Sequence, residues 1–115
     1  ERPAAKGDFR GFLPRFTGEN LARNLQLVEA MRSIATAKRA SVAQIAIAWA
    51  LSRGDDVVPL VGARRRDRLS EALGALDVRL TPEDLAQLEK AVPPDAAAGT
   101  RYDAGQMAML DSERR

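Results

Sequence analysis

The chain has 115 residues, enough for one small domain, whereas a closed (β/α)8 barrel takes about 200 residues or more. Hydrophobic residues make up 45% and charged residues 30%, which are the values of a globular protein and exclude the disordered, collagen-like and membrane classes. The absence of cysteine and histidine excludes disulfides, thiolate metal sites and histidine-based catalysis by these residues alone, and a net charge of +2 does not indicate a nucleic-acid or membrane partner.

The start of the chain does not resemble a targeting segment. Glu1-Arg2-Pro3 has neither the basic start nor the apolar centre of a signal peptide, and no apolar stretch has the length of a membrane span. We therefore expect a cytoplasmic location. Because the chain begins at Glu1 without a methionine, we also expect an upstream portion outside these residues.

The first third of the chain predicts a loop followed by a helix. Residues 1–19 are rich in glycine and proline and show no periodicity, which indicates an irregular loop. From about Asn20 to Ala37, apolar residues recur at steps of three and four, the pattern of an amphipathic helix.

A second helix is predicted to begin at Ser41, so that residues 20–53 are mainly helical. The Ser41 hydroxyl can cap free backbone N–H groups while Gln44 reaches back, in a capping box. Apolar residues, Trp49 among them, cover this helix almost all round. We therefore expect it to pack against more than one neighbour, with Trp49 in the core, and to end at Gly54.

The run Val57-Val58-Pro59-Leu60-Val61 predicts a strand at 56–61 that is buried on both faces, as in a parallel sheet. A lone strand leaves its backbone groups unpaired, and the chain offers no second convincing strand. Its partners are therefore expected from upstream residues or from a second chain.

Two further helices follow. Leu69, Leu73 and Leu76 indicate a helix in the segment 62–76, with Gly74 weakening its last turn. Thr81 as cap, followed by a proline and acidic residues, begins a helix at 81–92. The tail at 93–115 is expected to be irregular, apart from a helical turn around Gln106 to Leu110. The order of helix, strand and helix predicts an α/β protein and about a quarter of a parallel barrel.

The most informative residues lie between the predicted strand and the third helix. They form the arginine turn, which we define as Gly62-Ala63-Arg64-Arg65-Arg66-Asp67-Arg68. Phosphate groups often bind where the last strands of a barrel end beside a helix N-terminus. Gly62 would allow a ligand to approach the backbone closely, or would adopt a left-handed conformation.

Three adjacent arginines near a helix N-terminus oppose the helix dipole and repel one another. A bound phosphate would relieve both effects and could accept bidentate hydrogen bonds from arginine. Spacing alone also allows a solvated basic turn that binds nothing, or a nucleic-acid contact, although no aromatic residues interleave with these arginines.

Several separated motifs resemble, in order and spacing, the C-terminal portion of bacterial NADP-dependent aldo-keto reductases. They cover most of residues 7 to 95 and include Arg15-Phe16-Thr17-Gly18-Glu19-Asn20, Ser41-Val42-Ala43-Gln44-Ile45-Ala46-Ile47-Ala48-Trp49, Val58-Pro59-Leu60-Val61-Gly62-Ala63-Arg64 and Leu80-Thr81-Pro82-Glu83-Asp84-Leu85. The resemblance implies that residues 1–115 are the C-terminal region of a (β/α)8 TIM barrel that passes a hydride between NADPH and a carbonyl or alcohol. Residues 1–19 would cover the cofactor, and the strand at 56–61 would be the last of the barrel.

The same resemblance implies roles for individual residues. Gly62 and Arg64, with Ala63 between them, would line the 2′-phosphate and ribose of NADP, with Arg65 as a helper.

Further along the third helix, Arg68 would contact the phosphate or stack on the adenine, and Glu71 would face the adenine amino group. Ala72 stands where the family usually has an asparagine that contacts adenine, so one hydrogen bond is missing there.

The family's catalytic aspartate, tyrosine, lysine and histidine lie on earlier strands, so no catalytic residue is assigned here. Tyr102 lies in the tail, where packing or exposure is expected in place of catalysis. The Asp55-Asp56 pair precedes the strand, at the barrel end opposite the usual active site, so no metal site is expected.

The resulting hypothesis is an NADP-dependent oxidoreductase that acts on a small carbonyl substrate, with these residues inactive by themselves. The alternatives are a non-catalytic nucleotide-binding or regulatory relative, a truncated fragment without activity, and a small helical nucleic-acid binder.

Overall fold

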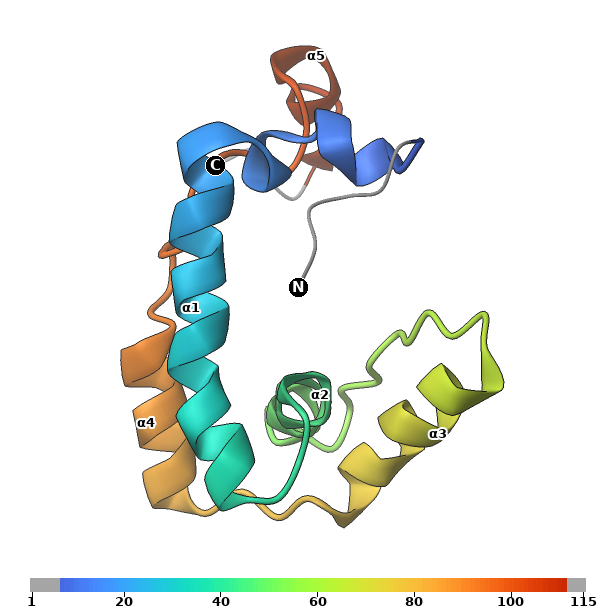
Figure 1. Cartoon of the computed structure of the whole chain (residues 1–115), viewed down its shortest axis with the longest axis vertical. Coiled ribbons are helices and arrows are strands. Elements are labelled where there is room, and N and C mark those ends of the chain that lie inside the picture. The colour runs from blue at the N-terminus through green and yellow to red at the C-terminus, as the bar shows by residue number, and fades with distance from the viewer. Residues whose placement is uncertain (1–6, 112–115) are drawn as a thin grey trace. The chain divides into compact units, whose positions relative to one another are not determined.

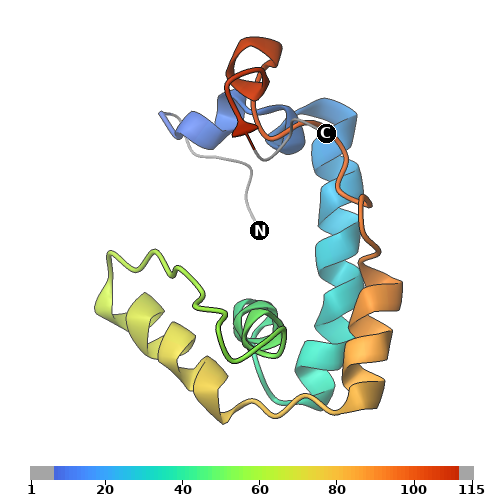
Figure 2. The same cartoon turned by 180° about the vertical axis from the view of Figure 1, so that it is seen from behind.

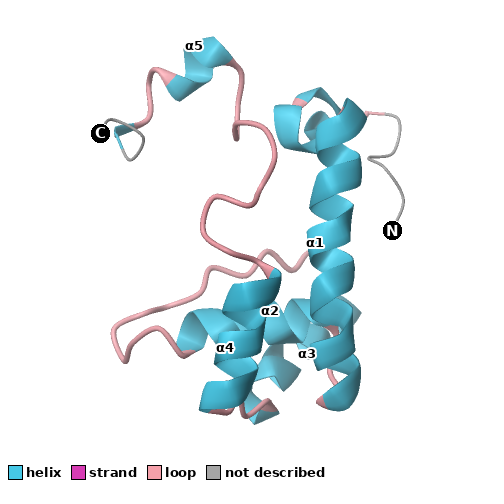
Figure 3. Ribbon diagram, turned by 90° about the vertical axis from the view of Figure 1, so that its left-hand side faces the viewer, coloured by secondary structure: helices cyan, strands magenta, loops and turns pink. Residues whose placement is uncertain are grey.

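The computed structural model describes residues 7–111, and all regular structure in this range is helical (Figures 1 and 3). The α-helices are α1 (Gly18–Ala37), α2 (Val42–Leu51), α3 (Arg66–Leu73), α4 (Pro82–Ala91) and α5 (Ala104–Met107), and the 3₁₀ segments are η1 (Phe9–Phe12), η2 (Pro14–Phe16) and η3 (Gly74–Asp77). No helix in the described range is both long and apolar enough to cross a bilayer.

The chain divides into two compact units. In the described range, the first contains residues 7–27 and 94–111, and the second contains residues 28–93. Residues 1–6 of the predicted loop and residues 112–115 of the predicted tail lie outside the described residues.

In the second unit, α2 begins with the capping box that its sequence predicts, and α4 begins with the predicted Thr81 cap, which the structure shows to be a capping box as well. Ser41 Oγ accepts from the Gln44 N–H at 3.2 Å, and Gln44 Oε1 accepts from the Ser41 N–H at 2.9 Å. Thr81 and Asp84 make the same reciprocal pair at α4, with a proline in the first helical turn. Each cap satisfies N–H groups that a helix leaves unpaired and stabilises it by about 1 kcal/mol.

The core of the second unit is small. Ile34 and Ala35 from α1, Ile45 from α2 and Leu88 from α4 form one buried cluster, and α4 lies alongside the second half of α1 (Figures 1 and 2). On another side, α2 packs against α3 and η3, where Ala75 is buried. The prediction that α2 has more than one neighbour is therefore confirmed.

The predicted buried strand at 56–61 is wrong for this chain. Residues 57–61 lie within the connection between α2 and α3 and form no regular structure, and the Val58 and Leu60 side chains are 80% and 97% exposed. A strand needs a neighbouring strand for its N–H and C=O groups, and residues 7–111 provide none. Pro59 also removes one donor.

Trp49 is less buried than the sequence predicts. Trp49 is 38% exposed and lies outside the core, where the Arg53 guanidinium stands 5.3 Å from its ring centroid. The leucines that indicated the third helix are also largely exposed: Leu69 by 47%, Leu73 by 56% and Leu76 by 69%.

In the first unit, side chains of α1 join the predicted loop to the tail. The Asn24 amide donates to the carbonyls of Arg15 and Ala98, each at 2.9 Å, and accepts from the Ala98 N–H at 2.8 Å. Arg15 Nε donates to the Gly99 carbonyl at 3.1 Å. The predicted helical turn of the tail is α5, which Asp103 caps.

Candidate functional site

The arginine turn leads from the irregular segment after α2 into α3. No side chain of the N-cap residue hydrogen-bonds to the backbone N–H groups at the N-terminus of α3. Arg65 is its N-cap residue and makes no capping hydrogen bond, whereas Ser41, Thr81 and Asp103 cap α2, α4 and α5. Free N–H groups and the positive end of the helix dipole make such a terminus attractive to an anion.

The Asp67 carboxylate is an anion of the chain itself that interacts with this helix N-terminus and with Arg65. It accepts from Arg65 at 2.7 Å (Nη2 to Oδ2) and 2.9 Å (Nε to Oδ1). The Arg65 hydrogen bond lowers the pKa of Asp67, and the backbone N–H groups of Asp67 and Arg68 lower it further. The pair is exposed, so it is screened by solvent and a stronger anion can displace it.

Arg64 and Arg66 have no such partner. Both side chains are exposed, and within residues 7–111 neither makes a hydrogen bond or an ion pair. They are the guanidinium groups of the turn that are available to an external anion without first breaking a contact.

Gly62 is not in the left-handed region, so that reason for a glycine is wrong. A Cβ added at Gly62 would have no atom within 4 Å, which means that the chain itself has room for a side chain there. Ala63, which follows, is half-buried. The open space beside Gly62 is compatible with the close approach of a ligand.

On α3, Arg68 and Glu71 form an ion pair one turn apart, with Nη1 2.8 Å from Oε2. The pKa of Glu71 is lowered first by a hydrogen bond from the Ser41 hydroxyl and then by the Arg68 guanidinium. Ala72 is half-buried and has no side-chain hydrogen-bonding group. The structure therefore brings Arg68 and Glu71 together, and adds Ser41 to them.

Sequence reasoning missed a second contact of α2 with this helix. Gln44 Nε2 donates to the Glu71 carbonyl at 2.9 Å. Ser41 and Gln44 were recognisable as a capping box, but the 27 residues between Gln44 and Glu71 contain no signal that would pair them.

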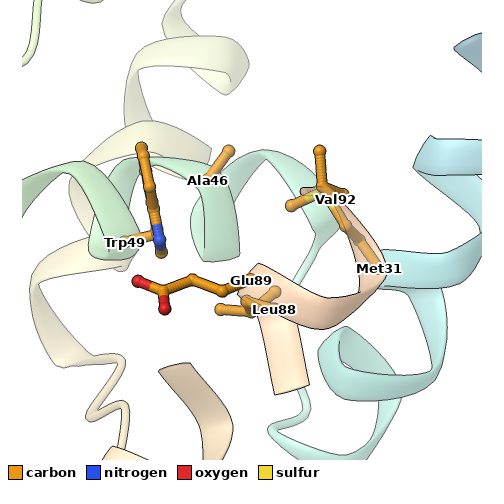
Figure 4. Close-up of a pocket in the computed structure, with 6 residues that line it drawn as sticks. All are labelled: Met31, Ala46, Trp49, Leu88, Glu89 and Val92. Atoms are coloured by element: carbon orange, nitrogen blue, oxygen red, sulfur yellow. The ribbon is translucent and has the colours of Figure 1, made fainter. Parts of the chain in front are cut away.

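A cavity of about 140 Å³ lies away from the arginine turn, between the second half of α1, α2 and α4 (Figure 4). Its lining is mostly apolar and consists of Met31, Ala46, Trp49, Leu88, Glu89 and Val92. It contains none of the predicted site residues and has no basic lining group for a phosphate. The Glu89 carboxylate is engaged by Arg53 at 2.8 Å.

Tyr102 is half-buried in the tail of the first unit. Asp55 and Asp56 are exposed, and no group of three potential metal ligands occurs among the described residues.

Comparison with known proteins places the chain in a family. The Aldo/keto reductase family model matches residues 2–93. The chain is 38% identical over 100 residues to "Aldo-keto reductase yakc [NADP(+)]" of Schizosaccharomyces pombe, covering 87% of this chain and 29% of that protein. It is 42% identical over 89 residues to "Probable aldo-keto reductase 1" of Glycine max, covering 77% of this chain and 26% of that protein. The chain thus spans less than a third of either relative, and it belongs to the aldo/keto reductase family.

Proposed function

We propose that this chain supplies the segment that binds the 2′-phosphate and adenosine of NADPH in an enzyme that transfers a hydride between NADPH and a carbonyl or alcohol. Family membership implies a (β/α)8 barrel, and one relative carries NADP(+) in its name. NADPH would supply the hydride, while residues of this chain would bind and orient its adenosine end.

The observation that carries the proposal is the arginine turn at the start of α3, where no N-cap side chain satisfies the helix and the exposed Arg64 and Arg66 have no partner in the described range. A phosphate monoester is a dianion with several acceptor oxygens, and it matches guanidinium groups and helix N–H groups together. These residues therefore fit the group that distinguishes NADP from NAD.

Individual roles follow from the contacts. Arg64 would bind the 2′-phosphate directly, and Gly62 would let the ribose approach the backbone. Arg65 would first have to leave Asp67, which makes it a weaker contributor. Arg68 would leave Glu71 for the phosphate or for the adenine ring, and Glu71 would then be free to accept from the adenine amino group.

The catalytic groups would come from outside this chain. We assign none here, and we propose that the substrate is a small carbonyl compound bound by other parts of the barrel. The exposed Val58 and Leu60 suit a segment that pairs as a strand with upstream residues or with a second chain.

Titration of the full-length gene product with NADPH and NADH tests the proposal. Arg64→Ala should weaken NADPH binding by about 10- to 100-fold, the equivalent of one lost hydrogen bond to a charged group, and should leave NADH binding nearly unchanged. Arg68→Ala should have a smaller effect, because Arg68 gives up its Glu71 pair to bind. Arg79→Ala removes an exposed arginine outside the turn and serves as the matched control.

Equal affinities for NADPH and NADH in the parent, or no loss on Arg64→Ala, would refute the phosphate role. A turnover assay on the same samples separates an active reductase from a non-catalytic nucleotide-binding relative.

A further inference from the structure

We propose that Gln44 is a positioning residue that holds α3, and with it the nucleotide site, against the first turn of α2, and that residue 74 is glycine because the Gln44 amide needs its space. This inference rests on the proposed function and adds residues that lie outside the arginine turn.

Both ends of the Gln44 amide are engaged. Oε1 accepts from the Ser41 N–H at 2.9 Å, within the capping box of α2, and Nε2 donates to the Glu71 carbonyl at 2.9 Å. The capping box fixes the direction of the amide, so its N–H can only point toward α3. One side chain therefore connects the first turn of α2 with the helix that carries Arg68.

Gly74 is the second observation. A Cβ built on Gly74 would overlap Nε2 of Gln44 and would lie 3.6 Å from Cδ. Gly74 has an ordinary right-handed conformation with φ −61°, so the backbone does not require glycine. A free glutamine could swing aside, but this one is held at both ends of its amide.

The connection extends to the charged groups of the site. The Ser41 hydroxyl, which caps α2, also lowers the pKa of Glu71, whose carboxylate holds Arg68 at 2.8 Å. Displacement of α3 from α2 would thus move the Glu71 and Arg68 pair together with the uncapped N-terminus of α3.

Gln44→Glu is the informative substitution, because it keeps an oxygen acceptor for the capping box and replaces the donor to Glu71 with a second oxygen. A carboxylate at a helix N-terminus is also favourable for α2. We expect helix content to be unchanged, amide hydrogen exchange across residues 66–77 to accelerate, and the NADPH over NADH preference of the full-length gene product to fall by about 2- to 10-fold. Gln87→Glu adds the same charge at an exposed position of α4 and should change none of these.

Gly74→Ala tests the steric part. In the parent it should accelerate exchange across residues 66–77 and lower the NADPH preference. Combined with Gln44→Ala, which removes the amide, it should cause no additional change. If Gly74→Ala has the same effect in both backgrounds, Gly74 does not make room for Gln44, and the steric claim is overturned.

The outcomes also separate this inference from the proposed function. If Arg64→Ala lowers the NADPH preference and Gln44→Glu does not, Gln44 does not position the site and the inference fails alone. If Arg64→Ala has no effect, the proposed function fails, and positioning of a nucleotide site fails with it. Unchanged exchange in Gln44→Glu would refute the connection between α2 and α3 regardless of cofactor binding.

Discussion

The small core of the second unit makes Ile45 its most sensitive position. Ile45 is fully buried, with 0% of its surface exposed, and packs with Ile34, Ala35 and Leu88. Ile45→Ala removes its outer carbons, at about 0.8 kcal/mol each, which gives roughly 2.4 kcal/mol before the cost of the cavity is added. With the cavity, we expect a loss above that figure and up to about 5 kcal/mol in the free energy of unfolding, out of the roughly 5 to 15 kcal/mol that a typical domain has.

Ile47→Ala is the matched control, because it removes the same atoms from the same helix at a half-buried position. It should cost less than half as much. Urea unfolding followed by circular dichroism measures both losses, and the dependence of the free energy on urea should stay constant. An Ile47→Ala loss as large as that of Ile45→Ala would show that α2 buries a different face and would refute this account of the core.

Two more predictions follow from charge and from exposed apolar surface. The ion pair with Lys38, followed by the Thr81 N–H, lowers the pKa of Asp84, so Asp84 should stabilise the fold above the pKa of its unfolded form and lose that effect as the pH falls below about 4. Asp84→Asn keeps the capping oxygen and should flatten the acid side of the melting-temperature profile; an unaltered profile would contradict this. The 115 residues produced alone should self-associate and show no reductase activity, because Val58 and Leu60 are exposed, and size-exclusion chromatography that finds a compact monomer would argue against it.

Local signals in the sequence were enough to predict the helices and their starts. Ser41 with Gln44 predicts the start of α2, because a capping box involves only residues three apart. Thr81 followed by Pro82 and acidic residues predicts the start of α4, because the cap, the proline and the helix dipole all act within the first turn. The order of motifs from Arg15 to Leu85 likewise indicated the family that the comparisons show. The roles of Gly62, Arg64 and Arg68 stay predictions.

Long-range relations were decided only by the tertiary structure. The strand predicted at 56–61 does not form, because its apolar pattern describes a segment between neighbours that the described residues do not provide. Trp49 has the large apolar side chain of a typical core residue, yet in α2 its ring lies outside the core and contacts Arg53.

The sequence by itself therefore determined where helices start, which family the chain resembles and where basic charge gathers, since each depends on residues close together in the chain. Only the packing of α2 on α3 decided that Gln44 meets Glu71 and Gly74, because contacts between distant residues depend on how whole helices bury their apolar faces.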